Sequence, residues 1–192
     1  MKRLIIATTN AGKVIEIHSG LGEIPNWILE PLPQGTPSVE ETGTTFVDNA
    51  ILKAEHYSQF DGALTLADDS GLCVNALGGR PGIHSARYAP DPPSRIKRIL
   101  DEMKSVPEGQ RQAAFYCALA LAENGRIVWL VQGEVHGVIA HEASGTYGFG
   151  YDPVFRLPEL NSTMADLSTE DRNRLSARGK ALAILRKFLL SY

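Results

Sequence analysis

The chain has 192 residues, of which 43% are hydrophobic and 21% charged, and its formal net charge is −3. This composition is typical of a globular protein and excludes a disordered or fibrous chain. The small negative charge argues against bulk nucleic-acid binding, which usually requires a basic face. A chain of this length fits one domain, residues 1–192, with a sizeable core.

Neither the cysteines nor the apolar runs indicate an exported protein. Cys73 and Cys117 lie in apolar, strand-like segments without CxxC or metal-ligand spacing, which fits a reducing compartment better than a disulfide framework. The apolar run within residues 1–8 is too short for a signal peptide or a membrane span, and no other segment approaches that length. We therefore expect a cytoplasmic protein with no membrane partner.

The first part of the chain alternates between strand-like and helix-like patterns. Short apolar runs predict strands, and apolar residues at helical spacing predict helices. The predicted strands cover residues 3–9 and 26–33, and the predicted helices cover residues 14–21 and 46–60. Thr44 or Thr45 is suited to cap the second helix, because a threonine hydroxyl accepts a hydrogen bond from the free amides of a first helical turn.

Two further strand candidates, residues 63–67 and 72–77, flank the tetrapeptide Asp68-Asp69-Ser70-Gly71. The first strand is therefore expected to end at Asp68-Asp69. Asp, Ser and Gly are residues that turns favour, so the tetrapeptide is either a simple turn between two strands or a site of chemistry. Residues 92–104 begin with two prolines and carry apolar residues at helical spacing. A third helix is therefore predicted there.

The last part of the chain predicts a long hairpin and a long helix. Its strand-like segments are residues 111–123 and 126–139. They meet at Asn124-Gly125, a dipeptide strongly associated with tight hairpins. Ser168 and Asp171 form a capping-box pattern at the start of one long C-terminal helix. Strands alternating with helices, together with the hairpin, predict an α/β domain around a mixed central sheet flanked by helices.

A polar turn links the first predicted strand to the first predicted helix, and it consists of Thr8, Thr9, Asn10, Ala11, Gly12 and Lys13. Free backbone amides at a helix N-terminus, a glycine that permits close approach and a lysine charge together form an anion-binding site. The segment lacks the GxxxxGK[ST] pattern of a Walker A loop. The alternative is an ordinary turn with an exposed lysine.

Two pairs of adjacent acids are candidate metal ligands. Glu40 and Glu41 precede a predicted helix, and Asp68 and Asp69 end a predicted strand, a placement that allows both pairs to lie at one edge of the sheet. Adjacent carboxylates repel unless a cation or buried donors compensate them. Mg²⁺ suits this need, because it takes one or two carboxylates and leaves its other positions to water and phosphates. The alternative is solvated loop acids and a simple turn.

Three other features are candidates for ligand binding. Lys53 lies two helical turns after Phe46, so it is not forced onto the far solvent face, although a helix lysine is usually solvated. The loop over residues 145–153 combines glycines with aromatic residues and can wrap a flat base, or it can be a turn with its aromatics in the core. Arg172 and Arg178 lie on or beside the last predicted helix, where arginines are usually surface residues.

Six segments carry a family resemblance when they are taken in order: ATTNAGKVIEI, EETGTTFVDNAILKA, ADDSGL, LGGRPGIHSARYA, GFGYDPVF and LSTEDRNRLSARGKAL. Together they resemble the inosine/xanthosine triphosphate pyrophosphatases, also called Ham1-like or non-standard purine NTP pyrophosphatases. The resemblance extends from Thr8 to beyond Ala181, nearly the full chain.

The resemblance implies a fold and an activity. The fold is the ITPase-like (Ham1/Maf-type) fold, with a mixed central sheet, flanking helices and a cleft between two lobes. The activity is hydrolysis of ITP, dITP and XTP to the monophosphate and pyrophosphate, which removes these nucleotides from the pool. Mg²⁺ as cofactor and a cytoplasmic homodimer are further implications.

The resemblance also implies roles for individual residues. Lys13 and Lys53 supply positive charge in catalysis, and Asp69 is the general base. Mg²⁺ is held by Asp69 and by one of Glu40 and Glu41, with Asp68 nearby. The residues implied in substrate binding are Thr8, Thr9, Asn10, Ala11, Gly12, Lys13, Ser70, Phe149, Gly150, Tyr151, Asp152, Arg172, Ala177 and Arg178.

The chain departs from the family pattern near its end. It has Ser176-Ala177-Arg178 where the family usually has Ser-His-Arg, and Arg172 where a lysine is expected. The lost imidazole bears on base selectivity rather than on hydrolysis. A 6-oxo purine carries a hydrogen-bond acceptor where adenine carries a donor, so a pocket that presents Arg178 and backbone amides to that edge would favour the former.

We expect in-line attack of water on the α-phosphorus, with Asp69 orienting or deprotonating the water. One alternative is a phosphatase that uses Asp69 as a covalent nucleophile, although the chain lacks the usual DxDx[ST] spacing. Another is a nucleotide sensor or nucleic-acid-binding module without catalysis. Residues 95–98 are the basic cluster that would serve it, and a solvated helix face explains that run equally well.

Overall fold

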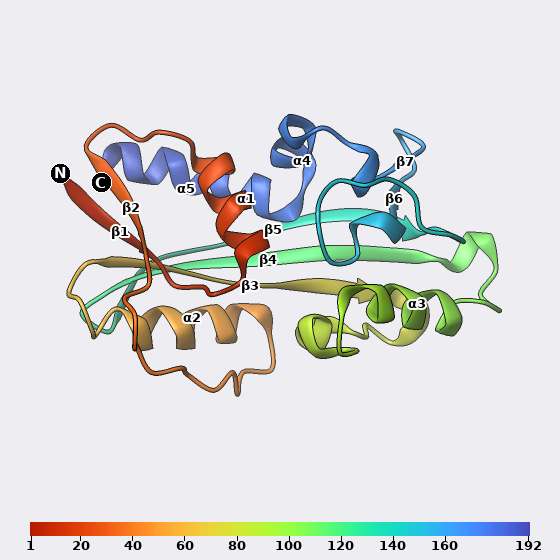
Figure 1. Cartoon of the computed structure of the whole chain (residues 1–192), viewed down its shortest axis with the longest axis horizontal. Coiled ribbons are helices and arrows are strands. Elements are labelled where there is room, and N and C mark those ends of the chain that lie inside the picture. Colours follow the sequence, from red (N-terminus) through yellow and green to blue (C-terminus); the bar gives the residue numbers. More distant parts are fainter. The chain divides into compact units, whose positions relative to one another are not determined.

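A mixed seven-stranded sheet forms the centre of the computed structural model, which describes residues 1–192 (Figure 1). The strand order is β2-β1-β3-β4-β5-β6-β7. The strands are β1 (Lys2–Ile6), β2 (Trp27–Pro31), β3 (Leu64–Val74), β4 (Gln112–Glu123), β5 (Arg126–Ile139), β6 (Phe155–Leu157) and β7 (Ser162–Thr163). This arrangement confirms the predicted α/β class.

Five α-helices accompany the sheet, and none of them is long and apolar enough to span a membrane. They are α1 (Ala11–Leu21), α2 (Phe46–Tyr57), α3 (Pro92–Glu102), α4 (Thr169–Leu175) and α5 (Ala177–Ser191). The short 3-10 helices are η1 (Asn75–Leu77), η2 (Gly82–Arg87), η3 (Glu108–Gln110), η4 (Asp152–Val154) and η5 (Met164–Asp166).

The chain divides into two compact units according to its internal contacts. Unit 1 comprises Met1–Asp69, Cys117–Gly133 and Arg178–Tyr192, and unit 2 comprises Ser70–Tyr116 and Glu134–Ala177. Strands β3, β4 and β5 each contribute residues to both units.

In unit 1, β1 is parallel to both of its neighbours, β2 and β3. The chain leaves β1 through α1 toward β2 and returns through α2 to β3. Because such crossovers are right-handed, two crossovers in opposite directions place their helices on opposite faces of the sheet. Figure 1 shows α1 and α5 on one face and α2 on the other. The contact between α1 and α5 is close, since a Cβ on Gly20 would lie 2.6 Å from Leu182 Cδ1.

In unit 2, a buried arginine secures the segment that leads into β4. Arg111 is 2% exposed and donates hydrogen bonds to four backbone carbonyls. Its Nε bonds Ile139 O at 2.7 Å and its Nη2 bonds Ala140 O at 2.9 Å, while Nη1 bonds Met103 O at 2.8 Å and Val106 O at 3.1 Å. One side chain therefore joins the end of β5 to the segment that follows α3.

Several local predictions are confirmed. Asn124 and Gly125 have φ values of 50° and 75°, as the tight hairpin between β4 and β5 requires. Thr45 caps α2 in a capping box with Asp48, and the Ser168 side chain accepts a hydrogen bond from Asp171 N at the start of α4.

The expected end of a strand at Asp68-Asp69, and with it the alternative of a simple turn over residues 68–71, is wrong, because β3 is continuous from Leu64 to Val74. The turn propensity of these residues is overridden by tertiary contacts, as propensities often are when a segment is buried. Both aspartates are buried, and each carboxylate accepts hydrogen bonds from side chains on neighbouring helices.

The single long C-terminal helix is also wrong, since α4 ends at Leu175 and α5 begins at Ala177. Between them Ser176 is extended, with ψ of 156°. Serine is favoured at the position before a helix, so the break is compatible with the local sequence. No glycine or proline marks it, which explains why the pattern of apolar residues did not reveal it.

Replacing Arg111 by alanine should strongly destabilise the protein. Two buried and two partly buried carbonyls would lose their donor, and leaving such groups unsatisfied should lower the free energy of unfolding by about 3 kcal/mol or more. Urea denaturation of Arg111→Ala measures the loss. Arg126→Ala, at the exposed start of β5, is the control and should be nearly neutral. Equal stability of the two variants would contradict the role given to Arg111.

Candidate functional site

Asp68 and Asp69 project from opposite faces of β3, because successive side chains alternate along a strand. Asp68 contacts Lys13 of α1 and Arg178 of α5, whereas Asp69 contacts Asn49 and Lys53 of α2. The two carboxylates are thus separated by the strand rather than gathered at one loop edge. Each is met by cationic side chains from its own side.

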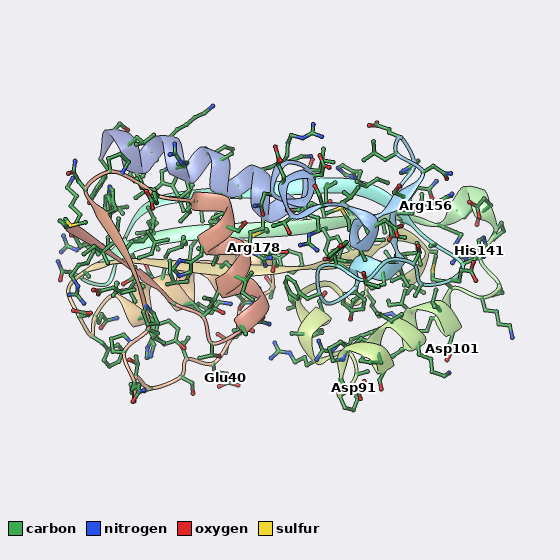
Figure 2. The ribbon with its side chains drawn as sticks, turned by 45° about the horizontal axis from the view of Figure 1, so that its top comes forward. Glu40, Asp91, Asp101, His141, Arg156 and Arg178 are labelled. Atoms are coloured by element: carbon green, nitrogen blue, oxygen red, sulfur yellow. The ribbon has the colours of Figure 1, made fainter.

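On the face of α1 and α5, four charged side chains form a buried network. Asp68 Oδ2 lies 3.2 Å from Lys13 Nζ and 3.0 Å from Arg178 Nη2. Arg178 Nη1 also donates to Glu16 of α1, and Figure 2 shows Arg178 in this region of the molecule. The Asp68 side chain is fully buried and that of Arg178 is 7% exposed. Two anions thus balance two cations, with Asp68 and Arg178 buried and Lys13 and Glu16 partly exposed.

On the face of α2, the second network contains two carboxylates, one lysine and one amide. Lys53 Nζ lies 2.7 Å from Glu41 Oε1 and 3.5 Å from Asp69 Oδ1. Asn49 Nδ2 donates to Asp69 Oδ2 at 3.2 Å. Asn49 and Lys53 are four residues apart on α2, so both face the strand. Spacing alone favoured a solvated Lys53, and that expectation is wrong, since the residue is 9% exposed.

A glycine sets the orientation of Asn49. The backbone amide of Gly43 donates to Asn49 Oδ1 at 2.8 Å, which leaves the amide nitrogen to face Asp69. A Cβ on Gly43 would lie 2.7 Å from that oxygen and 2.6 Å from Asp48 Cβ. The chain can therefore approach α2 this closely only with glycine at position 43.

The pKa values of the adjacent aspartates, Asp68 and Asp69, are shifted in opposite directions. Burial acts to raise the pKa of Asp68, but the positive charges of Lys13, Arg178 and Lys53 outweigh it and hold the pKa well below its usual value. Burial raises the pKa of Asp69, and Lys53 and Lys13 offset this only in part. Burial would lower the pKa of Lys53, yet the negative charges of Asp69 and Asp68 keep it above normal. Asp68 is thus a fixed anion, whereas Asp69 is the more basic carboxylate.

The predicted anion-binding turn runs into α1, since Thr8, Thr9 and Asn10 precede the helix whereas Ala11, Gly12 and Lys13 form its first turn. Asn10 caps the helix by accepting a hydrogen bond from Lys13 N at 3.2 Å, and Thr8 Oγ1 accepts one from Asn10 N at 3.2 Å. Thr9, Asn10 and Ala11 are exposed, which leaves this end of α1 open to solvent.

The two candidate glutamates, Glu40 and Glu41, differ in exposure and in their contacts. Glu41 is half-buried and bonds Lys53, whereas Glu40 is exposed on the outside of the loop that precedes α2 (Figure 2). Only Glu41 joins the network around Asp69.

In unit 2, the glycine-rich loop is held by an aspartate that points back into it. Asp152 is 9% exposed, and its Oδ2 accepts a hydrogen bond from Phe149 N at 3.0 Å. Gly148 has φ of 78°, and a Cβ there would lie 2.0 Å from the same oxygen. Tyr147 and Phe149 are 59% and 36% exposed, whereas Tyr151 is 4% exposed, so the loop presents two aromatic rings and buries the third.

Arg172 lies beside this loop with unused donors. Its Nη1 is 2.9 Å from the position that a Gly148 Cβ would take. Nε and Nη1 are buried without a hydrogen-bond partner, while Nη2 makes one long contact with Thr169 Oγ1 at 3.4 Å. Buried donors are normally satisfied, so this pair is suited to an acceptor on a ligand. Of the other predicted residues in unit 2, Ser70 is half-buried on β3 and Ala177 is buried at the start of α5.

Comparisons with known proteins identify the family of the chain. The Ham1 family model matches residues 4–188. The chain is 46% identical over 191 residues to the dITP/XTP pyrophosphatase of Pectobacterium atrosepticum, with 96% of each chain covered. It is 47% identical over 192 residues to the dITP/XTP pyrophosphatase of Geobacillus kaustophilus, with 96% of this chain and 93% of the relative covered. The chain belongs to the Ham1 family.

A solved Ham1 structure confirms the fold that the resemblance implied. The structure of a HAM1 protein from Coxiella burnetii is 37% identical, covers 100% of both chains and has a TM-score of 0.90. The predicted family membership and the ITPase-like mixed sheet with flanking helices are therefore both confirmed.

The acids of this Ham1-family chain fit a metal that is only partly held by protein. No group of three His, Cys, Asp or Glu side chains is placed to hold a metal ion. Glu41 and Asp69, however, contact the same ammonium group, so two carboxylates border one cationic position. This donor set fits Mg²⁺, which takes one or two carboxylates and completes its shell with water and phosphate oxygens. Asp68, on the opposite face of β3, is not part of this pair.

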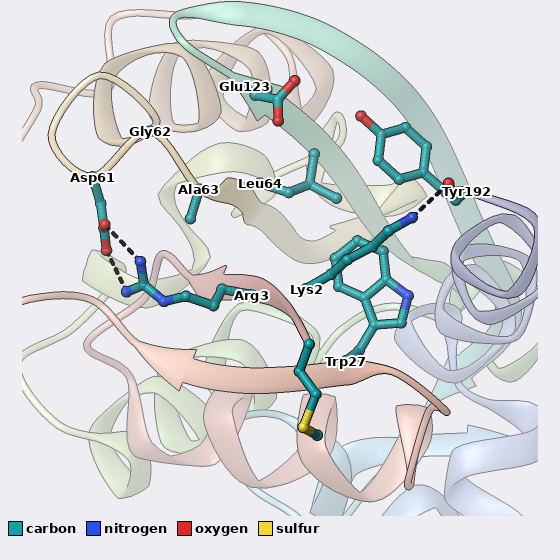
Figure 3. Close-up of a pocket in the computed structure, with 10 residues that line it drawn as sticks. Lys2, Arg3, Trp27, Asp61, Gly62, Ala63, Leu64, Glu123 and Tyr192 are labelled. Atoms are coloured by element: carbon teal, nitrogen blue, oxygen red, sulfur yellow. Dashed lines mark hydrogen bonds and ion pairs between the residues drawn. The ribbon is translucent and has the colours of Figure 1, made fainter.

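A pocket of about 380 Å³ in unit 1 is not the candidate site (Figure 3). It is lined by Met1, Lys2, Arg3, Trp27, Asp61, Gly62, Ala63, Leu64, Glu123 and Tyr192. None of the predicted site residues lines it. Several of its charges are already engaged, since Arg3 pairs with Asp61 at 2.8 Å and Lys2 Nζ donates to Tyr192 O at 2.7 Å.

The sequence interpretation missed Glu16 and Asn49. Glu16 lies three residues after Lys13, and Asn49 lies four residues before Lys53, so each shares a helix face with a predicted site lysine. That spacing was the available signal. It identifies neighbours on a helix but not which of them is buried.

Replacing Asp68 by asparagine should destabilise the protein at neutral pH. Lys13 and Arg178 would keep buried positive charges without their shared partner, which should cost about 3 kcal/mol. Because the folded-state pKa of Asp68 is lowered, its stabilisation is fully present above its ordinary pKa of about 3.9 and is lost as the pH falls below that value. Urea unfolding should therefore show the difference between wild type and Asp68→Asn shrinking below about pH 4. Asp61→Asn, which affects a more exposed pair, is the control, and equal losses would contradict the prediction.

Proposed function

We propose that this Ham1-family chain is a nucleoside triphosphate pyrophosphatase acting on non-standard purine nucleotides, dITP, ITP and XTP. The observation that carries the proposal is the network of buried Asp69, Asn49 and Lys53 with half-buried Glu41. It presents a carboxylate of raised pKa beside a lysine, with Lys13 close enough to influence it. The relatives named dITP/XTP pyrophosphatases support the choice of substrate.

The proposed reaction is hydrolysis between the α- and β-phosphorus atoms. The oxygen of a water molecule bonds to the α-phosphorus, the bond to the bridging oxygen breaks, and pyrophosphate leaves. Asp69 orients the water and accepts its proton, a role suited to a carboxylate whose pKa burial has raised. Lys53 and Lys13 stabilise negative charge on the phosphates, and the exposed amides at the start of α1 bind phosphate oxygens.

Mg²⁺ is the proposed cofactor, held by Glu41 and Asp69. When bound, it would neutralise charge on the phosphate oxygens. Lys53 bridges these two carboxylates in the structure. Its ammonium group would therefore have to move away or lie beside the metal when Mg²⁺ binds between them. Neither Glu40 nor Asp68 is needed as a ligand.

Base recognition is assigned to unit 2. Phe149 offers an exposed ring for stacking, and Arg172 offers two unused buried donors. A 6-oxo group accepts a hydrogen bond from such donors, whereas the 6-amino group of adenine would face them with another donor. The role predicted for Arg178 at the base stays a prediction, since its guanidinium contacts Asp68 and Glu16.

A cytoplasmic homodimer is proposed on the family resemblance.

Pyrophosphate release from dITP, XTP, ITP, dGTP and dATP in the presence of Mg²⁺ tests the proposed function. We expect release from the first three and much slower release from the last two. Orthophosphate in place of pyrophosphate would instead indicate the covalent phosphatase. Tight binding of dITP without turnover would indicate a nucleotide sensor.

Replacing Asp69 by asparagine should lower kcat at least about 100-fold, since it removes both the base and a ligand charge. The fold should survive, because the new amide oxygen can accept from Asn49 while Lys53 keeps its bond to Glu41. Pyrophosphate release under saturating dITP measures the effect, and circular dichroism checks the fold. Near-normal turnover would end the assignment of Asp69.

Replacing each of the adjacent glutamates, Glu41 and Glu40, in turn tests which of them binds the metal. Glu41→Gln should raise the Mg²⁺ concentration needed for half-maximal activity by about 10-fold, because one of two carboxylate ligands is lost. Glu40→Gln, one residue away and exposed, should shift it by less than about twofold. A titration of activity against Mg²⁺ measures this concentration for both variants. A larger increase in Glu40→Gln than in Glu41→Gln would assign the metal to Glu40.

A further inference from the structure

Ser85 is a buried residue in η2 that joins three segments of unit 2. It is 6% exposed. Its hydroxyl donates to Gly82 O at 2.6 Å and accepts from the backbone amide of Leu72 at 2.9 Å. Its own carbonyl accepts a hydrogen bond from the Tyr151 hydroxyl at 2.8 Å. One small residue therefore contacts both β3 and the glycine-rich loop.

The bond from Leu72 to Ser85 takes the place of the hydrogen bond that a neighbouring strand would make with this part of β3. β1 pairs with β3 only at Leu64, Thr65 and Leu66. Leu66 O faces β1, because it accepts from Ala7 N at 2.7 Å. Residues at even spacing from Leu66 direct their backbone groups to the same edge, so the amide of Leu72 lies on this edge beyond the end of β1. A buried amide there needs a partner, and the hydroxyl of Ser85 supplies it.

The rest of the segment before Ser85 follows β3 in the same way. Val74 N donates to Arg80 O at 3.2 Å, and Cys73 forms an isolated bridge with Pro81. Ser85 thus closes a series of contacts along the edge of β3. This gives η2 a fixed position relative to the strand.

The bond to Tyr151 fixes the loop that is assigned to the base. Tyr151 lies at the start of η4, between Phe149 and Asp152, and is 4% exposed. Burial raises its pKa to about 12, so the hydroxyl stays protonated and remains a donor at neutral pH. The Phe149 amide is tied to Asp152, so a shift of Tyr151 would move both residues.

We propose that Ser85 is a positioning residue for base selectivity, which it serves by anchoring Tyr151, and hence the loop over residues 148–152, to β3. This inference rests on the proposed function and goes beyond it, since Ser85 itself contacts neither the base nor the phosphates. Loss of the anchor should loosen the base-binding loop while the chemical step is preserved.

The test compares Ser85→Ala with a matched control, Ser58→Ala. Ser58 is also buried, and its hydroxyl donates to Glu55 O at 3.2 Å and accepts from Gly125 N at 2.9 Å. Both variants lose one donor and one acceptor contact of a buried serine. Both should therefore lower Tm by similar amounts.

Only Ser85→Ala should change recognition of the nucleotide. We expect its KM for dITP to rise about 10-fold with kcat within about threefold, and the ratio of kcat/KM for dITP over dATP to fall about 10-fold. Ser58→Ala should leave KM and this ratio within about twofold. A Ser85→Ala enzyme that loses Tm but keeps wild-type KM and selectivity would overturn the proposal.

Two further measurements keep the outcome decisive. Tyr151→Phe removes the next bond in the same anchor, the one to the Ser85 carbonyl that Ser85→Ala leaves in place, and should reproduce the loss of selectivity if Ser85→Ala does not fold. Hydrogen exchange should increase at residues 149–152 in Ser85→Ala and not in Ser58→Ala. An unchanged exchange rate would count against the anchor even if the wild-type protein released no pyrophosphate. Increased exchange in a protein that is inactive would uphold the anchor and remove the proposed function.

Discussion

The continuity of β3 through two adjacent aspartates is the constraint on which the site depends. An extended strand sends successive side chains to opposite faces, so Asp68 and Asp69 must be compensated separately. Lys13 and Arg178 meet the first, and Lys53 and Asn49 meet the second. The helices of unit 1 are thereby tied to one strand by charge as well as by apolar packing.

This arrangement explains why the charged residues of unit 1 are spread over elements far apart in the sequence. The crossovers from β1 to β2 and from β2 to β3 place α1 and α2 on opposite faces, and each helix contributes a lysine near its own aspartate. Arg178 brings α5 to the face of α1, where Glu16 holds its second nitrogen. A buried charge is costly unless it is paired, so each cation is tolerated because its partner is fixed.

Much of the fold could be predicted because its signals are local. The hairpin at Asn124-Gly125 and the cap at Thr45 depend on the chemistry of a few neighbouring residues. The end of the strand expected at Asp68-Asp69 was wrong because helices distant in sequence supply the partners that keep these residues extended. The break at Ser176 was missed for a related reason, since no helix-breaking residue marks it.

The residue types of the candidate site could be predicted from the sequence, but not which of these residues contact one another. Lys53 and Asp69 were expected in one site, and they are in contact. Whether Glu40 or Glu41 joins them depends on which way a loop turns, and adjacent residues give no local signal for that. Asn49 could have been found from its spacing to Lys53, but its value depends on the amide of Gly43, which orients it.

The opposite pKa shifts of two neighbouring carboxylates indicate that they have different tasks. Asp68 is surrounded by positive charge and stays ionised, so it can hold Lys13 and Arg178 but is a poor proton acceptor. Asp69 has its pKa raised by burial, which brings it closer to the range in which a carboxylate accepts a proton from water. One strand thus carries a structural anion and a candidate base at consecutive positions. Exchanging their environments would require exchanging the helices on either side of the sheet, so the topology itself determines which aspartate can act as the base.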